Sequence, residues 1–152
     1  MSLLSKAALV AITLGLAASG LGCKNSNTPS PVQVTEKFTG TLNPRSNDFR
    51  TFTVNYTYNA TEADITVNSL ATVANQTPVT GITIGIAIGL LSATNTCVEQ
   101  TFNRAATIGQ SYPQSVTAGQ YCAQISDCPP NTIGCTSNLT EPVTYTMTVV
   151  HY

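Results

Sequence analysis

Apolar and hydroxylated residues alternate along much of this chain with a period of two. The segment 143–149, VTYTMTV, shows the pattern most clearly, with large apolar residues at the odd positions and Thr at the even ones. Successive side chains of a β-strand point to opposite faces, so this pattern predicts a strand with one buried and one exposed face. The same alternation covers 52–58, 65–68, 82–90 and 121–125, and more weakly 34–42, 101–108 and 111–117.

The remaining composition supports an all-β fold. Thr, a β-branched residue that favours strands, accounts for 24 of the residues from Cys23 onward. Turn-forming residues such as Asn43-Pro44 and Glu141-Pro142 separate the alternating segments. About eight short strands punctuated by turns predict an antiparallel, jelly-roll-like β-sandwich. We expect it to span residues 34–152 as one domain.

The segment 81–91 is uncharged and rich in Ile. It is typical of a central strand of the core, and the alternative is an adhesive edge used for strand addition. Gly85 and Gly89 leave the second face of this segment almost bare. That bareness predicts close packing on the second face, for example by aromatic side chains of the other sheet.

The N-terminal residues have the layout of a secretory signal peptide. Lys6 precedes an apolar run over 7–18, and small residues follow up to Gly22-Cys23. The uncharged stretch 7–22 is 16 residues long, which is short for a membrane-spanning helix of about 20 residues. The alternatives to a lipoprotein signal are an ordinary signal peptide cut nearby and an uncleaved N-terminal anchor.

The Gly22-Cys23 ending resembles a bacterial lipobox, in which the signal is cut before a Cys whose sulfur is then lipidated. Gly20 stands where the lipobox prefers Leu, and Leu21 comes one place late. The resemblance implies a lipoprotein signal peptide over 1–22, palmitate-type acylation of Cys23, and attachment to the membrane. Residues 23–33 then form a lipidated polar tether. Lys24, rather than Asp, follows the Cys, which favours the bacterial outer membrane, with the domain facing the periplasm or the surface.

The cysteine count fits this interpretation. Five is odd for an exported protein, and lipidation of Cys23 leaves the even set Cys97, Cys122, Cys128 and Cys135. An exported context favours disulfides, of which three pairings are possible. We favour Cys97–Cys122 between neighbouring strands and Cys128–Cys135 across a turn-rich loop. A Cys₄ zinc site is the alternative, but the spacing lacks a CxxC pair, so neither metal nor cofactor is predicted.

Residues suited to catalysis are scarce. His151 is the only His, and we expect it to be exposed or at an edge. No Ser lies in a GxSxG context, and Glu62 and Asp64, two apart on one strand face, are expected to be solvated acids. The chain is therefore predicted to be no enzyme and to have no catalytic residues. With six basic and seven acidic residues, the net charge is −1, which argues against nucleic-acid binding.

Three segments carry a family resemblance. FTGTLNPRSNDFRTFTV over 38–54, the strand at Ala118–Cys122 and the strand at Val143–Val149 resemble the corresponding motifs of bacterial pre-peptidase C-terminal domains. The similarity covers roughly residues 36–151 and implies a β-sandwich module without catalytic residues, here free-standing rather than fused to a peptidase.

Collagen-binding modules related to that family bind calcium through clustered acids. Here Asp48 lies in the corresponding opening loop, and Glu62 and Asp64 follow one strand later. These acids are too few for calcium, which takes about 6–8 oxygen ligands.

These observations together predict a non-enzymatic, lipid-anchored module of the bacterial envelope. It would act as a binding or structural protein toward an envelope protein or glycan that the sequence does not identify. One alternative is a cell-surface carbohydrate-binding module with Tyr112, Tyr121 and Phe102 as candidate sugar-stacking rings. The other is an accessory domain of an exported enzyme.

Overall fold

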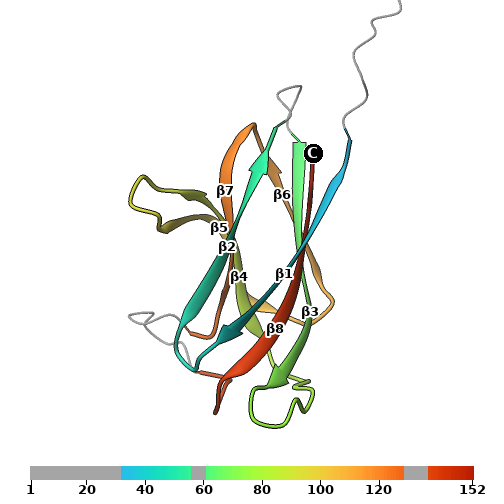
Figure 1. Ribbon diagram of the computed structural model, residues 1–152, viewed down its shortest axis with the longest axis vertical. Coiled ribbons are helices and arrows are strands. Elements are labelled where there is room, and N and C mark those ends of the chain that lie inside the picture. The colour runs from blue at the N-terminus through green and yellow to red at the C-terminus, as the bar shows by residue number, and fades with distance from the viewer. Residues whose placement is uncertain (1–31, 56–60, 129–136) are drawn as a thin grey trace, which may run out of the picture.

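The computed structural model of this chain describes residues 32–55, 61–128 and 137–152. These residues form two four-stranded sheets that lie against each other as layers (Figure 1). The strands are β1 (Val34–Leu42), β2 (Asn47–Val54), β3 (Thr61–Thr72), β4 (Ile84–Leu91), β5 (Cys97–Ala106), β6 (Ser111–Val116), β7 (Gly119–Ser126) and β8 (Val143–His151).

The strand order is that of a jelly roll. One sheet runs β1-β8-β3-β6 and the other β2-β7-β4-β5, with every pairing antiparallel. The chain alternates between the layers up to β4, turns back in a hairpin to β5, and alternates again. The predicted all-β, eight-stranded sandwich is therefore confirmed. No helix among the described residues has the length and apolar character needed to cross a membrane.

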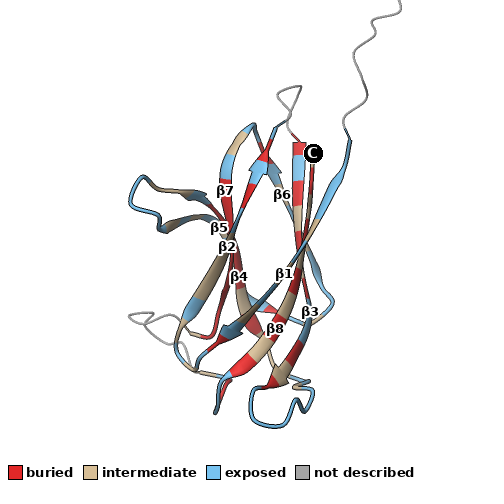
Figure 2. Ribbon diagram, viewed as in Figure 1, coloured by how far each residue is buried: buried red, intermediate tan, exposed pale blue. Residues whose placement is uncertain are grey.

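The core lies between the sheets and follows the predicted alternation. In β8, the odd residues from Val143 to His151 are buried and the even ones are half-buried (Figure 2). Ile84, Ile86 and Ile88 of β4 meet them from the other sheet as part of one apolar cluster. Strand β1 has its predicted bounds, whereas β5 begins at Cys97, four residues before the predicted start.

The bare face of β4 is covered differently from our expectation. A Cβ on Gly89 would collide with the Val98 carbonyl oxygen, lie 2.7 Å from its carbonyl carbon and lie 3.1 Å from Cys122 Sγ. The group against Gly89 is thus the backbone of the neighbouring strand β5, so the expectation of aromatic side chains from the other sheet was wrong.

This close approach accommodates a disulfide. Cys97 of β5 is bonded to Cys122 of β7, with 5.7 Å between their Cα atoms, although β4 lies between these strands in the sheet. Gly89 pairs with Cys122, so the bridge passes a position of β4 that carries no side chain. The predicted Cys97–Cys122 pairing is confirmed. Cys128 is also disulfide-bonded, and Cys135, its predicted partner, lies outside the described residues.

Candidate functional site

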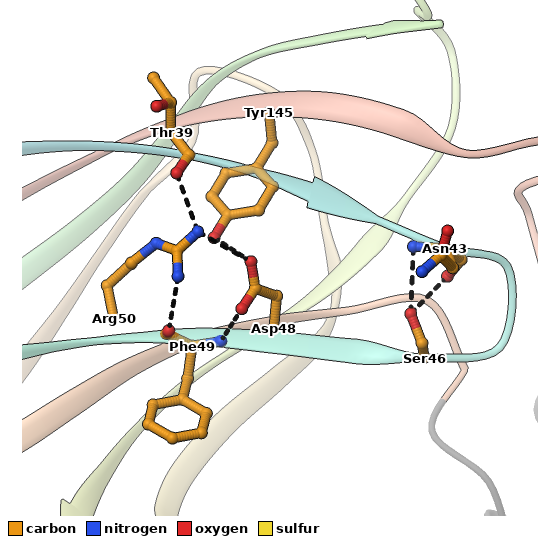
Figure 3. Close-up of polar contacts among 7 residues, drawn as sticks. All are labelled: Thr39, Asn43, Ser46, Asp48, Phe49, Arg50 and Tyr145. Carbon is orange, nitrogen blue, oxygen red and sulfur yellow. Dashed lines mark hydrogen bonds and ion pairs between the residues drawn. The ribbon is translucent and has the colours of Figure 1, made fainter. Parts of the chain in front are cut away.

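The edge formed by β1 and β2 is sealed by a polar cluster (Figure 3). The Arg50 guanidinium donates to the Thr39 carbonyl of β1 at 2.9 Å and to the Phe49 carbonyl of β2 at 3.4 Å. Asp48 accepts a hydrogen bond from the Phe49 N–H at 2.9 Å and forms an ion pair with Arg50 at 3.1 Å. Three backbone groups of these two edge strands, the Thr39 carbonyl and the Phe49 N–H and carbonyl, are therefore occupied here.

Tyr145 of β8 anchors this cluster to the core. Its hydroxyl donates to Asp48 Oδ2 at 2.8 Å, and its side chain is fully buried. Burial, followed by the hydrogen bond to Asp48, raises the pKa of Tyr145 well above its ordinary value of 10.0. Gly40 leaves the space for this contact, because a Cβ there would lie 2.6 Å from both Asp48 Oδ2 and the Tyr145 hydroxyl. A phenol held in its neutral form is suited to bridging strands rather than to acting as a base.

The acids considered for calcium do not converge. Asp48 lies on β2 of one sheet, whereas Glu62 and Asp64 lie on β3 of the other. The Asp64 carboxylate accepts hydrogen bonds from the Ser111 hydroxyl at 2.5 Å and from the Tyr112 N–H at 2.9 Å. Across the described part of the chain, no three His, Cys, Asp or Glu side chains gather in a way that could hold a metal ion.

Asp127 is a buried carboxylate that the sequence analysis did not single out. It accepts hydrogen bonds from the Arg45 N–H at 3.1 Å, the Ser137 hydroxyl at 2.5 Å and the Asn138 N–H at 2.9 Å. It therefore ties the β1–β2 turn to the segment that leads into β8. An Asp directly after an alternating strand was the available signal, but its partners come from distant parts of the chain.

The expectation that His151 is exposed or at an edge was wrong. His151 is 2 % exposed, its Nε2 lies 2.8 Å from Glu36 Oε1, and its ring lies 5.2 Å from that of Phe52. Strand β8 is an interior strand of its sheet, and position 151 continues the inward-facing odd residues. Extending the alternation from Val149 to the next odd position would have predicted this burial.

The opposite side of the sandwich is open. A groove of about 240 Å³ lies between the edge strands β5 and β6. Its apolar surface comes from Ile88, Leu90 and Val116, and its polar lining residues are Gln100, Thr101, Gln114, Ser115, Thr117 and Tyr121. None of these described lining residues carries a charge.

Strand β6, on one side of this groove, is an edge strand whose backbone groups are partly occupied. At the outer edge of β6, Pro113 has no N–H to donate and its carbonyl accepts a hydrogen bond from Gln114 Nε2 at 2.6 Å. The Thr117 N–H donates to the Tyr121 hydroxyl at 3.1 Å. The segment Gln114–Val116 pairs with β3 without a register shift, and the Val116 carbonyl accepts a hydrogen bond from the Thr61 hydroxyl at 3.2 Å. Across the groove, the buried Thr101 Oγ1 has no hydrogen-bond partner among the described residues. This uncharged groove is the candidate binding site.

The three candidate sugar-stacking rings do not form one platform. Phe102 is 52 % exposed, with the Arg104 guanidinium 4.2 Å from its ring centroid. Tyr121 is buried, stacks 5.7 Å from Phe52, and accepts a hydrogen bond from the Thr117 N–H at 3.1 Å. Tyr112 packs against the core. Phe102 is therefore the one of the three that offers a ring to solvent.

The comparisons with known proteins leave the family open. No family model matches the chain, and no curated protein matches it. A solved structure described as "Bacillus endospore appendages form a novel family of disulfide-linked pili" is similar over 78 % of this chain and 87 % of that chain. The two chains are 14 % identical and the TM-score is 0.31, so no functional conclusion rests on the likeness.

Proposed function

We propose that this chain is a non-enzymatic module, lipid-anchored through Cys23 to the bacterial outer membrane, that binds an envelope partner in the groove between β5 and β6. The observation that carries the proposal is the contrast between the two sides of the sandwich. Arg50, Asp48 and Tyr145 join the two sheets near Thr39 of β1, whereas an uncharged groove lies between β5 and β6.

The carboxylates support binding rather than catalysis. Asp48, Asp64 and Asp127 each accept hydrogen bonds from backbone N–H groups and from hydroxyls of other strands or loops. General acid–base chemistry needs a carboxyl or imidazole positioned to reach a substrate proton. These three side chains instead join segments of the fold. The resemblance to pre-peptidase C-terminal domains, which are non-catalytic sandwich modules, is consistent with the same role.

A carbohydrate-binding role is the second candidate, and the exposed ring of Phe102 favours it. Exposed aromatic rings give sugars an apolar face to stack on. Retention of the protein on a polysaccharide column, lost in Phe102→Ala and kept in Tyr112→Phe, would support this candidate. No retention on any glycan would remove it.

The anchor is tested by the intact mass of the protein extracted from its native membrane. We expect a chain that begins at Cys23, carries acyl groups, and gains two hydrogens per disulfide on reduction. The control is Cys23→Ala, which should leave the membrane fraction without acylation. An unacylated wild-type mass that begins elsewhere would contradict lipid anchoring and indicate a freely secreted protein.

A further inference from the structure

The groove between β5 and β6 lies near the end of the sandwich at which the tether joins β1, and the following inference rests on the binding role proposed above. We propose that residues 25–33, the uncharged part of the tether, fold back into this groove and occupy it until a partner displaces them. The tether thereby regulates access to the proposed binding site.

The first argument is the place where the tether ends. Val34, the first residue of β1, pairs with His151. The His151 ring lies 5.2 Å from the Phe52 ring, which in turn stacks 5.7 Å from the ring of Tyr121. Since Tyr121 lines the groove, three successive contacts lead from the end of the tether to the groove. Residues 25–33 span about 30 Å when extended at ~3.3 Å per residue, so they are long enough to cross this end of the sandwich.

The second argument is the chemistry of the segment. Residues 25–33 carry no charge, and neither do the described residues that line the groove. A charged side chain would lose its hydration in this groove without compensation, whereas a neutral segment avoids that cost. Val32 of the tether is 79 % exposed and Leu90 of the groove is 44 % exposed. Contact between these two side chains removes apolar surface of both from water.

The third argument is that the segment does not depend on free backbone groups in the groove. The Val116 carbonyl and the Thr117 N–H are already hydrogen-bonded within the protein, which disfavours the addition of a β-strand. The tether contains Pro29 and Pro31, and such segments favour the polyproline II conformation, which has no internal hydrogen bonds. Grooves bind this conformation through their side chains rather than by strand pairing.

Occupation by a segment of the same chain has a direct consequence for binding. A flexibly linked segment competes with a partner at an effective concentration in the millimolar range. The apparent affinity for the partner therefore falls in proportion to the fraction of molecules whose groove is empty. With the lipid anchor proposed at Cys23, displacement of the segment also lets the domain move further from the membrane.

The first test places a photoreactive residue at position 30 of the full chain and maps the crosslinked peptides by mass spectrometry. We expect an intramolecular crosslink, in monomeric protein, to peptides that contain residues 98–101 or 114–121. Leu90→Ser removes exposed apolar surface from the groove and should reduce the yield of this crosslink by about fivefold. Val73→Ser is the matched control, because Val73 is 45 % exposed and lies outside the groove, and it should leave the yield unchanged.

The second test measures competition with a capped peptide of residues 25–34, added to the isotopically labelled full chain and followed by amide NMR shifts. Pro31→Ser/Val32→Ser weakens docking of the chain's own segment. The peptide should therefore shift the groove amides of this variant and bind wild type about tenfold more weakly. The control Asn25→Ser/Asn27→Ser changes the same segment without its apolar residues and should bind the peptide as weakly as wild type.

The outcomes separate this inference from the proposed function. Absence of the intramolecular crosslink, or equal binding of the peptide to wild type and to Pro31→Ser/Val32→Ser, would overturn docking of the tether. A crosslink found only in covalent dimers would overturn it too, because the segment would then lie on a second copy. The proposed function fails separately, if photoreactive residues at positions 100 and 115 capture no envelope partner in native membranes while position 30 still crosslinks to the groove.

Discussion

Replacement of Gly89 by Ala should destabilise the protein in a way that depends on the disulfide. The added methyl group would meet the Val98 backbone and lie 3.1 Å from Cys122 Sγ. Overpacking of this kind costs about 1–3 kcal/mol. Relief requires the start of β5 to move, and Cys97 lies on that part of the strand.

The magnitude depends on whether the bridge still forms. Cys97 and Cys122 are 25 residues apart, and the chain-entropy relation gives about 3.5 kcal/mol for closing such a loop. We therefore expect Gly89→Ala to lower the free energy of unfolding by about 1–3 kcal/mol if the bridge forms, and by up to about 3.5 kcal/mol more if it does not. In a Cys97→Ser/Cys122→Ser background, the start of β5 is free to move, so the same substitution should cost about 1 kcal/mol or less.

The four proteins to compare are wild type, Gly89→Ala, Cys97→Ser/Cys122→Ser and the variant with all three substitutions. Urea denaturation of each, with a free-thiol assay of the folded states, measures how far the cost of Gly89→Ala depends on the disulfide. Gly109→Ala is the matched control. Gly109 has a φ of +82° and open space around its Cβ position, so its replacement should cost about 1–2 kcal/mol in either background. Equal costs of Gly89→Ala with and without the cysteines would refute the packing argument. A cost below about 0.5 kcal/mol with the bridge intact would do so too.

Three further predictions concern the polar contacts made by Tyr145, Asp127 and Arg50. Below pH 10 the Tyr145 phenol is neutral in both states, but above it the unfolded chain ionises while the raised pKa keeps the folded phenol neutral. Stability should then fall with rising pH by up to about 1.4 kcal/mol per unit more in wild type than in Tyr145→Phe, as measured by urea denaturation from pH 9 to 11. Asp127→Asn replaces an acceptor oxygen by a donor and should cost about 1–3 kcal/mol by the same measurement, whereas a change within 0.5 kcal/mol would contradict its role. Arg50→Ala should lower the free energy of unfolding by less than about 1 kcal/mol, because the ion pair is partly exposed. It should increase self-association measured by sedimentation, whereas the control Arg104→Ala should leave self-association unchanged.

The strands could be predicted because their signal is local. Period-two alternation predicted a segment that overlaps each of the eight strands, and β8 shows why: its inward and outward positions are distinguished by residue type alone. The bounds of β2 were wrong, because it begins at Asn47, five residues before the predicted start at Phe52. The predicted continuation over 56–58 lies outside the described residues. The alternation of β7 does not separate a buried face from an exposed one, because Tyr121 to Ser126 are buried on both faces of the strand. The face carrying Cys122 and Gln124 is covered by contacts from β5, including the Gln124–Glu99 hydrogen bond of 2.5 Å.

The candidate site could not be predicted from the sequence, because it depends on which strands lie at the sheet edges. Asp64 binds the Tyr112 N–H of β6 from 48 residues away, and Arg50 reaches β1 across the sandwich. No local pattern encodes either contact. Gly89 did signal a close approach, but only the sheet order shows that the approaching group is the backbone of β5.

The function proposed here is binding of a partner in the groove between β5 and β6. Site-specific photo-crosslinking in native membranes tests it most directly, with the photoreactive residue placed at position 100 or 115 in the groove, or at position 53 on β2. We expect a discrete adduct from positions 100 and 115 and none from position 53. Equal adducts from all three positions, or an adduct from position 53 alone, would contradict it.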